Sequence, residues 1–297
     1  MRVVQTVRQC AHLRTPRGHR MHVRLLLSID RSGTQAEAAE TVDLAHEFSQ
    51  KADPIVAGLD FSGNPLRSSF VEFASHFGHS LGLPASVHVG EKADDGVDLD
   101  AVLLHFRPER IGHVVCLEPR HVQALLDKPI PIEICPTSNL KTKIVAQLEQ
   151  HPFGTWRQRN NHSRSSSSSS TALASAAYPL VVCTDDSGVF HITLSSELHR
   201  LAEAFPMGRD ELLQLERQAL EHGFADEAYK AELRRVFTDF TTQDTLPVDP
   251  RPVAVLTCAG LEQAKAGDRA LLEAFAEQGL AAVMLACCSH SSRSSML

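Results

Sequence analysis

Several common signatures are missing from this 297-residue sequence. No run of about 18 apolar residues occurs, so no segment is expected to span a membrane. Basic residues are not in excess: the formal net charge is −7, which argues against a broad nucleic-acid-binding face. The seven cysteines are odd in number and include no C-x-x-C spacing. This pattern is typical of a reduced chain rather than a disulfide scaffold, so we expect a cytoplasmic protein without nucleic-acid or membrane partners.

The residues that are present favour an α/β protein. Hydrophobic residues make up 43% of the chain and charged residues 22%, which is enough for a packed core. Short β-rich runs alternate with helical stretches along the first two-thirds of the chain. The expected strands are residues 23–30, 54–60, 84–91, 110–114, 130–135 and 180–186, and the expected helices include 35–50, 66–81, 99–106 and 119–128. Such alternation predicts parallel βα units.

The six expected strands end in polar or acidic residues. A (β/α)₈ barrel gathers its active site at the carboxyl ends of its strands, so the pattern favours this fold. Six strands are two fewer than a closed barrel needs. We therefore predict an α/β, TIM-type barrel that is incomplete, with about six of its eight βα units.

Composition divides the chain into three parts. Residues 1–237 are expected to form the partial barrel, interrupted at 157–177 by a disordered insertion that contains six consecutive serines. Residues 238–252 are expected to be a polar linker, and residues 253–297 an unassigned βαβ-like fragment with a tail. The fragment is too small to fold alone.

Chemistry-bearing side chains concentrate at four strand ends. His88 and Glu91 lie in V-H-V-G-E, His113 in R-I-G-H, and Asp185 and Asp186 in C-T-D-D. Other interpretations stay open for several of these residues. A lone strand-end histidine is usually a hydrogen-bonded loop residue, and the Asp pair could cap the next helix. Asp30 is expected to contact substrate or to cap a helix, and Asp60 to cap a turn or pair locally. Cys135 and Cys183 are expected to be core residues.

These motifs, together with S-I-D-R at 28–31, G-L-D-F-S-G at 58–63 and T-D-D-S-G-V-F at 184–190, resemble the adenosine deaminase family. The match runs from about residue 23 to residue 237, and the closest likeness is to the adenosine-deaminase-like branch that acts on N6-methyl-AMP. The resemblance implies a metal-dependent hydrolase that deaminates purine C6 by hydrolysis. The implied reaction converts N6-methyl-AMP to IMP and methylamine; the alternatives are deamination of adenosine to inosine and a catalytically dead form.

The resemblance also implies roles for individual residues. His88 and Asp185 would bind one Zn²⁺ per chain, and zinc with an open coordination position lowers the pKa of a bound water. Glu91 would protonate purine N1, and His113 would orient the attacking water and stabilise its charge. Three further positions would contact a purine nucleotide or nucleoside: Asp186 at N7, Gly63 through its backbone N–H, and Asp30. A monomer is expected.

The sequence departs from the family pattern in two places. The first barrel strand of the family carries a His-x-His pair whose rings reach one metal from the same side of the strand. No His-x-His occurs here, and His19 and His22 are three residues apart and do not replace it. Val114 stands where a glycine commonly follows the histidine. These departures favour an N-terminally truncated barrel, and they leave open another amidohydrolase-type zinc enzyme or a protein that acts by binding alone.

Overall fold

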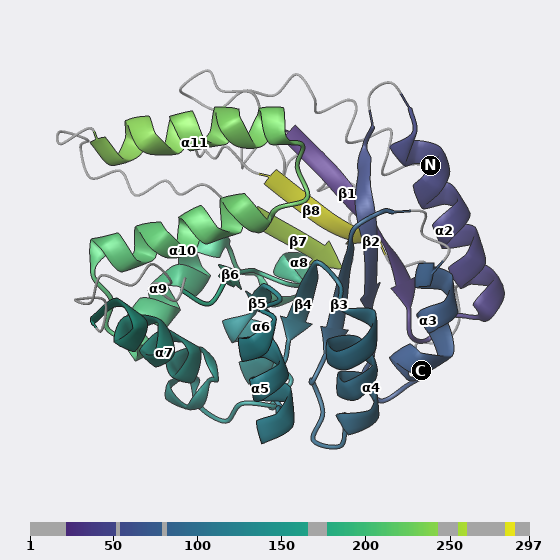
Figure 1. Ribbon diagram of the computed structural model, residues 1–297, viewed down its shortest axis with the longest axis horizontal. Coiled ribbons are helices and arrows are strands. Elements are labelled where there is room, and N and C mark those ends of the chain that lie inside the picture. Colours follow the sequence, from purple (N-terminus) through teal and green to yellow (C-terminus); the bar gives the residue numbers. More distant parts are fainter. Residues whose placement is uncertain are drawn as a thin grey trace.

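The computed structural model describes residues 22–51, 54–78, 82–165, 177–242, 255–259 and 283–288. Its strands form one parallel sheet in the order β6-β5-β4-β3-β2-β1-β8-β7 (Figure 1). The strands are β1 (His22–Asp30), β2 (Val56–Ser62), β3 (Ala85–Val89), β4 (Arg110–His113), β5 (Ile132–Ile134), β6 (Leu180–Val182), β7 (Val255–Ala259) and β8 (Val283–Cys288). All six predicted barrel strands are therefore confirmed, and their parallel pairing confirms the α/β class.

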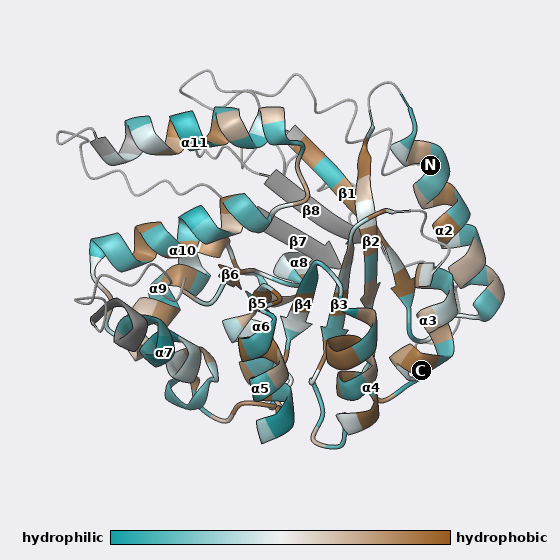
Figure 2. Cartoon of the chain, viewed as in Figure 1, coloured by the Kyte–Doolittle hydropathy of each residue, from teal (hydrophilic) through white to brown (hydrophobic). Residues whose placement is uncertain are grey.

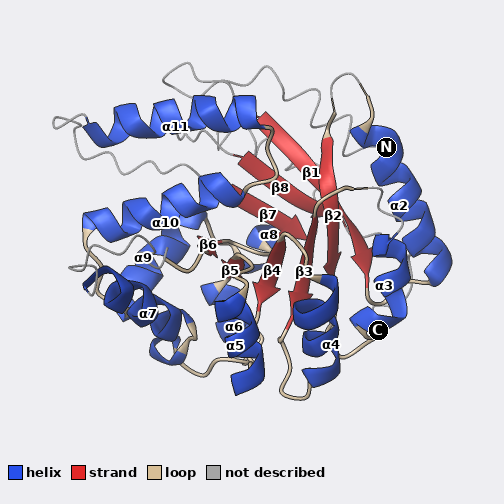
Figure 3. Cartoon of the chain, viewed as in Figure 1, coloured by secondary structure: helices blue, strands red, loops and turns tan. Residues whose placement is uncertain are grey.

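Helices connect the strands and cover the sheet (Figure 3). They are α2 (Gln35–Ser49), α3 (Phe70–Gly78), α4 (Gly96–Asp100), the π-helix η2 (Ala101–Phe106), α5 (Pro119–Asp127), α6 (Pro136–Lys141), the 3₁₀-helix η3 (Leu148–Gln150), α7 (Phe153–Ser165), α8 (Ser187–Phe190), α9 (Leu194–Ala204), α10 (Arg209–His222) and α11 (Glu227–Thr242). Along α2 and α3, hydrophobic residues alternate with hydrophilic ones, as Figure 2 shows, because only one side of each helix packs on the core. No helix in the described ranges is long and apolar enough to cross a membrane.

One face of the strands packs against the helices. Successive side chains on a strand point to opposite faces, so Leu59 and Phe61 share the face opposite Asp60. Phe61 is fully buried, and its ring centroid lies 5.3 Å from that of Phe70 and 5.7 Å from that of Phe73. Alternate residues of β1, β3, β4 and β5 extend the same apolar layer: Val23, Leu25, Ile29, Val87, Val89, Ile111, Ile132 and Ile134. This layer is the main core of the protein.

On β2, β3, β4 and β5 the other face is polar, whereas Leu26 of β1 joins a second apolar cluster there. Ser86, His88, Arg110 and Glu133 alternate with the core residues and are buried. The guanidinium of Arg110 binds Glu133 Oε1 at 2.6 Å and donates to the backbone carbonyl of His222 at 3.0 Å. It also lies 3.8 Å from the ring centroid of Phe224, so the segment after α10 closes the amino end of this face. The carboxyl end of the face holds the predicted site residues.

The unassigned C-terminal fragment contributes two strands to the sheet. β8 pairs in parallel with β1 from His22 to Leu27, and β7 pairs in parallel with β8. Both strands therefore extend the barrel sheet, because β1 offers them an edge with unpaired backbone groups. The predicted helix at 268–278 lies outside the described residues.

Two predicted boundaries also differ. The expected disordered insertion at 157–177 begins inside α7, where residues 157–165 are helical. Arg157 binds Glu211 at 2.5 Å and Asn160 binds the backbone of Tyr178 at 2.6 and 3.1 Å, so contacts with distant residues stabilise a stretch whose own sequence is polar. Residues 166–176 lie outside the described part. The expected linker at 238–252 likewise begins inside α11, which continues to Thr242.

Candidate active site

The turn after β3 brings His88 and Glu91 to the carboxyl end of the sheet. Gly90 has a φ of +74°, and its N–H donates to Asp95 Oδ2 at 2.6 Å. A Cβ on Gly90 would lie 2.9 Å from the Cα of Val114, so only glycine lets the turns after β3 and β4 approach this closely. The close approach sets Glu91 beside His113.

The end of β4 has an unusual backbone. His113 has a φ of +65° and Val114 a φ of +41°. A β-branched residue at positive φ is a genuine outlier and stores strain, which clusters at functional sites. Val114 is fully buried, so the predicted extra bulk at this position lies inside the protein.

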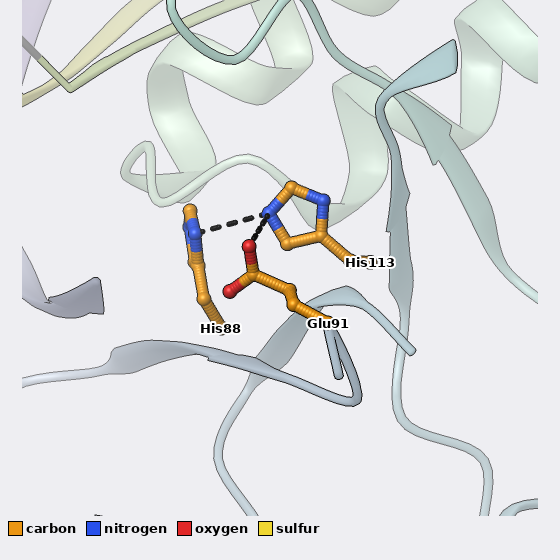
Figure 4. Close-up of side chains that lie close together, drawn as sticks. All are labelled: His88, Glu91 and His113. Atoms are coloured by element: carbon orange, nitrogen blue, oxygen red, sulfur yellow. Dashed lines mark hydrogen bonds and ion pairs between the residues drawn. The ribbon is translucent and has the colours of Figure 1, made fainter. Parts of the chain in front are cut away.

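Three predicted residues converge on one nitrogen atom of His113, and Figure 4 shows two of them, His88 and Glu91. His113 Nε2 lies 3.2 Å from His88 Nδ1 and 3.6 Å from Glu91 Oε2. Asp185 Oδ2 lies 3.8 Å from the same atom, and Asp185 also has a positive φ of 53°. The structure therefore brings together the four residues that sequence reasoning placed at the centre of the site.

A buried set of carboxylates surrounds the other side of the His88 ring. His88 Nε2 lies 3.4 Å from Asp60 Oδ1 and 3.9 Å from Glu133 Oε2. Burial alone would lower the pKa of His88, but Asp60, Asp185, Glu91 and Glu133 outweigh it and raise this pKa to about 9. The ring therefore lies in a strongly negative interior, which would favour any cation placed there.

Asp60 was expected to cap a turn or pair locally, and that expectation is wrong. Asp60 is fully buried in the middle of β2 and faces His88. The pairing of β2 with β3 causes this, since it aligns Asp60 with Ser86, two residues before His88. Glu133 and Arg110 were also missed. An acid between apolar residues of a strand, as in G-L-D-F and I-E-I, is the signal that could have revealed Asp60 and Glu133, because strand periodicity directs it to the opposite face.

Gly112 controls the position of the His88 ring. A Cβ on Gly112 would lie 2.8 Å from Cδ2 of His88. Behind the ring, the buried Arg31 donates to the backbone carbonyl of His88 and pairs with Asp98 Oδ2 at 3.2 Å. Arg31 therefore holds the backbone of His88, and the narrow space beside Gly112 restricts its ring.

Asp186 follows Asp185 at the start of α8. It occupies the N-cap position, but its side chain makes no capping hydrogen bond, so the helix-cap interpretation of this residue is not supported. Burial, followed by the charge of Asp185, raises the pKa of Asp186 to about 7. At neutral pH this carboxyl group can therefore donate a hydrogen bond as well as accept one.

Asp30 and Gly63 lie side by side at the ends of β1 and β2. Gly63 has a φ of +101°, and a Cβ there would lie 2.5 Å from Asp30 Oδ1. Asp30 Oδ1 accepts the N–H of Ser32 at 2.7 Å, whereas Thr34 caps α2. Asp30 is therefore a turn residue rather than the helix cap. No described contact links Asp30 or Gly63 to His88.

Several polar atoms around His88 are suited to a cation. His88 Nε2, both carboxylate oxygens of Asp60 and Glu91 Oε1 are buried and make no hydrogen bond. Unsatisfied buried polar atoms are rare in native proteins and indicate a bound ion or water. Two overlapping sets, one of His88, Glu91 and His113 and one of His113, Cys135 and Asp185, have ligand atoms within 4.8 Å of one another. Imidazole nitrogen and carboxylate ligands suit zinc, so the histidines and acids of these sets fit such an ion.

Cys135 and Cys183 are buried, as expected of core residues. Burial raises the pKa of the Cys135 thiol well above its usual range, which disfavours a nucleophilic thiolate. Asp185 and Cys183 act in the same direction on this pKa.

The comparison with known families decides the relationship. The family model described as adenosine deaminase matches residues 1–239. The chain belongs to the adenosine deaminase family. It is 35% identical over 221 residues to a Bos taurus protein named N6-Methyl-AMP deaminase. The aligned region covers 72% of this chain and 58% of that protein.

Solved structures of the family have the same fold. The Arabidopsis ADAL protein complexed with GMP superposes with a TM-score of 0.64 at 33% identity, covering 73% of this chain and 58% of that one. The same protein complexed with IMP gives a TM-score of 0.66 at 33% identity, with 78% and 62% covered. The present chain thus spans less than two-thirds of the length of these adenosine deaminase relatives. Their fold supports the predicted barrel class for residues 22–242.

Proposed function

We propose that this chain carries the site of a zinc-dependent purine deaminase that hydrolyses N6-methyl-AMP to IMP and methylamine. The observation that carries the proposal is the convergence of His88, Glu91 and Asp185 on His113 Nε2, within 3.2 to 3.8 Å. A proton donor, an imidazole and a metal-binding carboxylate at one point are the groups that displacement of an amine from purine C6 requires.

His88 and Asp185 would hold the zinc ion, which would supply an activated water at neutral pH. His88 and Asp185 each belong to a set of ligand atoms that includes His113 and lies within 4.8 Å, which supports a cation at this point. Asp60 and Glu133 would act on the ion through the ring of His88, by orienting it and adding negative charge.

Glu91 would protonate purine N1, because its Oε1 is buried, makes no hydrogen bond and is therefore available to substrate. His113 would hold the attacking water against C6. Asp186, whose pKa of about 7 lets it carry a proton, would donate to purine N7. Gly63 would offer its backbone N–H to the base, and Asp30 beside it would complete the substrate contacts.

A nucleotide is favoured over a nucleoside by the relatives. The Arabidopsis relative is solved with GMP and with IMP, and the Bos taurus relative is named for N6-methyl-AMP. We extend this substrate class to the present chain. Adenosine is the alternative substrate.

A second candidate is nucleotide binding without turnover. The observation that favours it is the absence of any His-x-His pair from the sequence, which leaves two of the ligands expected of the family without a counterpart. Two strong ligands are fewer than a stable zinc site uses.

The test compares zinc content, turnover and binding in the purified full chain. We expect about one zinc per chain by elemental analysis and release of methylamine from N6-methyl-AMP at a rate above that from adenosine. Glu91→Gln should lower the rate by about 10²–10⁴-fold without changing zinc content, whereas the exposed Glu149→Gln should leave both unchanged. IMP binding without zinc or turnover would establish the second candidate, and a chain that neither binds IMP nor releases methylamine would exclude both.

A further inference from the structure

A chain of hydrogen bonds leads away from His113 on the side opposite the reacting groups. Asn139 Nδ2 lies 3.1 Å from His113 Nδ1, and His151 Nε2 lies 2.9 Å from Asn139 Oδ1. His151 Nδ1 in turn accepts the backbone N–H of Phe153 at 3.0 Å. His113, Asn139 and His151 are all buried, so water does not compete for these bonds.

The backbone of Phe153 sets the direction of every bond in this chain. An N–H group can only donate, so His151 Nδ1 must carry a lone pair and the proton of the neutral ring must be on Nε2. His151 Nε2–H therefore donates to Asn139 Oδ1. The amide of Asn139 then presents its NH₂ group to His113, and His113 Nδ1 must accept.

The reverse arrangement is inconsistent with the Phe153 bond. If Asn139 were turned so that its oxygen faced His113, its NH₂ group would face His151 Nε2. Nε2 would then need a lone pair and His151 Nδ1 a proton, which would oppose the N–H of Phe153. Phe153 is the first residue of α7, where backbone N–H groups lack partners within the helix, so the bond to His151 also satisfies this helix end.

We propose that Asn139 and His151 are positioning residues that hold the His113 ring in the tautomer with its proton on Nε2. In this tautomer the N–H of His113 points at the place where His88, Glu91 and Asp185 converge. His113 is then a hydrogen-bond donor that stabilises negative charge on the attacking oxygen, and it cannot serve as the base that removes a proton from water. This role rests on the proposed function, whereas the tautomer does not.

The protonation state of His151 supports the proposal. Burial lowers the pKa of His151 to about 4. His151 is therefore neutral at physiological pH and keeps the single ring proton on which the direction of the chain depends.

The sequence carries this device in two short segments, C-P-T-S-N at 135–139 and H-P-F at 151–153. Asn139 lies in α6, which follows β5. The chain then passes through turns and η3 and brings His151 back to the side chain of Asn139. The role of His151 is not visible in the sequence, because it acts on the site only through Asn139.

The test reads the tautomer directly. Long-range ¹H–¹⁵N correlation spectra of the ¹⁵N-histidine-labelled full chain, with and without added Zn²⁺, distinguish a protonated ring nitrogen from an unprotonated one. His113→Gln identifies the signals of His113. We expect a protonated Nε2 and an unprotonated Nδ1 near pH 7.5. A protonated Nδ1 in the wild-type protein, or loss of the Nε2 proton when zinc binds, would overturn the proposal.

Asn139→Asp changes the direction of the chain with almost no change in shape. A carboxylate only accepts hydrogen bonds, so it keeps the bond from His151 and draws a proton onto His113 Nδ1. We expect the Nδ1 signal to become that of a protonated nitrogen, and the kcat for N6-methyl-AMP to fall by about 10²–10³-fold with a smaller change in KM. An unchanged His113 spectrum in this variant would contradict the proposal.

Asn160→Asp is the matched control, because Asn160 also bonds through both amide atoms but contacts the backbone of Tyr178. It should leave the His113 signals unmoved. His151→Met provides an independent variant that removes the anchor without adding charge. Asn139 can then turn, so both His113 nitrogens should show partial protonation, and a spectrum identical to wild type would exclude a role for His151.

Discussion

Asp60 and Phe61 are adjacent in β2 and both are fully buried, yet they lie in different kinds of interior. Phe61 packs among the rings of Phe70, Phe73 and Phe77. Asp60, on the opposite face of the same strand, has two carboxylate oxygens without a hydrogen bond and an imidazole 3.4 Å away. The same alternation continues through Val87 and His88 on β3.

The apolar outer face stabilises the fold, whereas the buried charged groups of the inner face cost stability. Burial of apolar area contributes about 25 cal/mol per Å². Burial of charges costs several kcal/mol per ion before pairing offsets it. A sheet that buried both faces for stability alone would carry near-continuous apolar runs. The polar inner face is therefore retained for chemistry, and substitutions on the two faces should have separable effects.

The largest expected effect is on the outer face. Phe70 is fully buried and its ring centroid lies 5.3 Å from those of Phe61 and Phe106. Phe70→Ala should lower the free energy of unfolding by about 3–5 kcal/mol in urea titrations. Zinc affinity of the folded fraction should not change. Val71→Ala, half-exposed on the same helix, should change stability by less than about 0.5 kcal/mol. A large loss of zinc affinity in Phe70→Ala would contradict the prediction that substitutions on the two faces have separable effects.

The inner face should respond in the opposite way. Asp60→Asn keeps the shape of the side chain and removes the charge that faces His88. We expect zinc affinity to fall by about 10–100-fold in competition titrations with a chelator, because an outer ligand partner is lost. The free energy of unfolding should rise or stay the same, because a buried carboxylate whose oxygens make no hydrogen bond is removed and His88 can become neutral by losing a proton. Asp43→Asn, exposed on α2, should change neither quantity, and a marked destabilisation by Asp60→Asn would contradict the comparison.

His151 should make the free energy of unfolding depend on pH. Its pKa falls from 6.5 to about 4 in the folded protein, so the unfolded chain binds a proton at higher pH than the native state does. Stability due to this residue is therefore complete above pH 6.5 and is lost as the pH falls toward 4. Between pH 8 and pH 5 the loss should be about 2 kcal/mol. His151→Gln should reduce the difference in unfolding free energy between these two pH values by that amount, and an undiminished difference would exclude His151 as its source.

The smallest expected effect is at the edge of the site. Gly63→Ala places a Cβ at a φ of +101° and close to Asp30 Oδ1. The strain should destabilise the protein by about 1 kcal/mol in thermal unfolding and weaken IMP binding through Asp30. Gly78→Ala, where a Cβ meets nothing within 4 Å, should be neutral or slightly stabilising. Equal effects of the two substitutions would show that Gly63 has no special conformation.

Local patterns predicted much of this structure. Short β-rich runs between helical stretches predicted the six barrel strands, and the polar residues at their ends predicted the meeting of His88, Glu91, His113 and Asp185, because parallel strands end at one edge. Asp60 was misread because it was considered alone rather than as the inward member of an alternating strand. His151 was missed because its contact with Asn139 depends on how a loop folds back. The placement of β8 beside β1 joins residues more than 250 positions apart in the chain, which no local pattern encodes.

Gly112 shows how little room the site leaves for change. The space beside Cδ2 of His88 is too small for one methyl group, since a Cβ there would approach to 2.8 Å. An alanine would turn the imidazole plane and alter both of its nitrogen contacts at once, with Asp60 on one side and His113 on the other. The alignment of the whole constellation therefore depends on a hydrogen atom at a position that contributes no functional group.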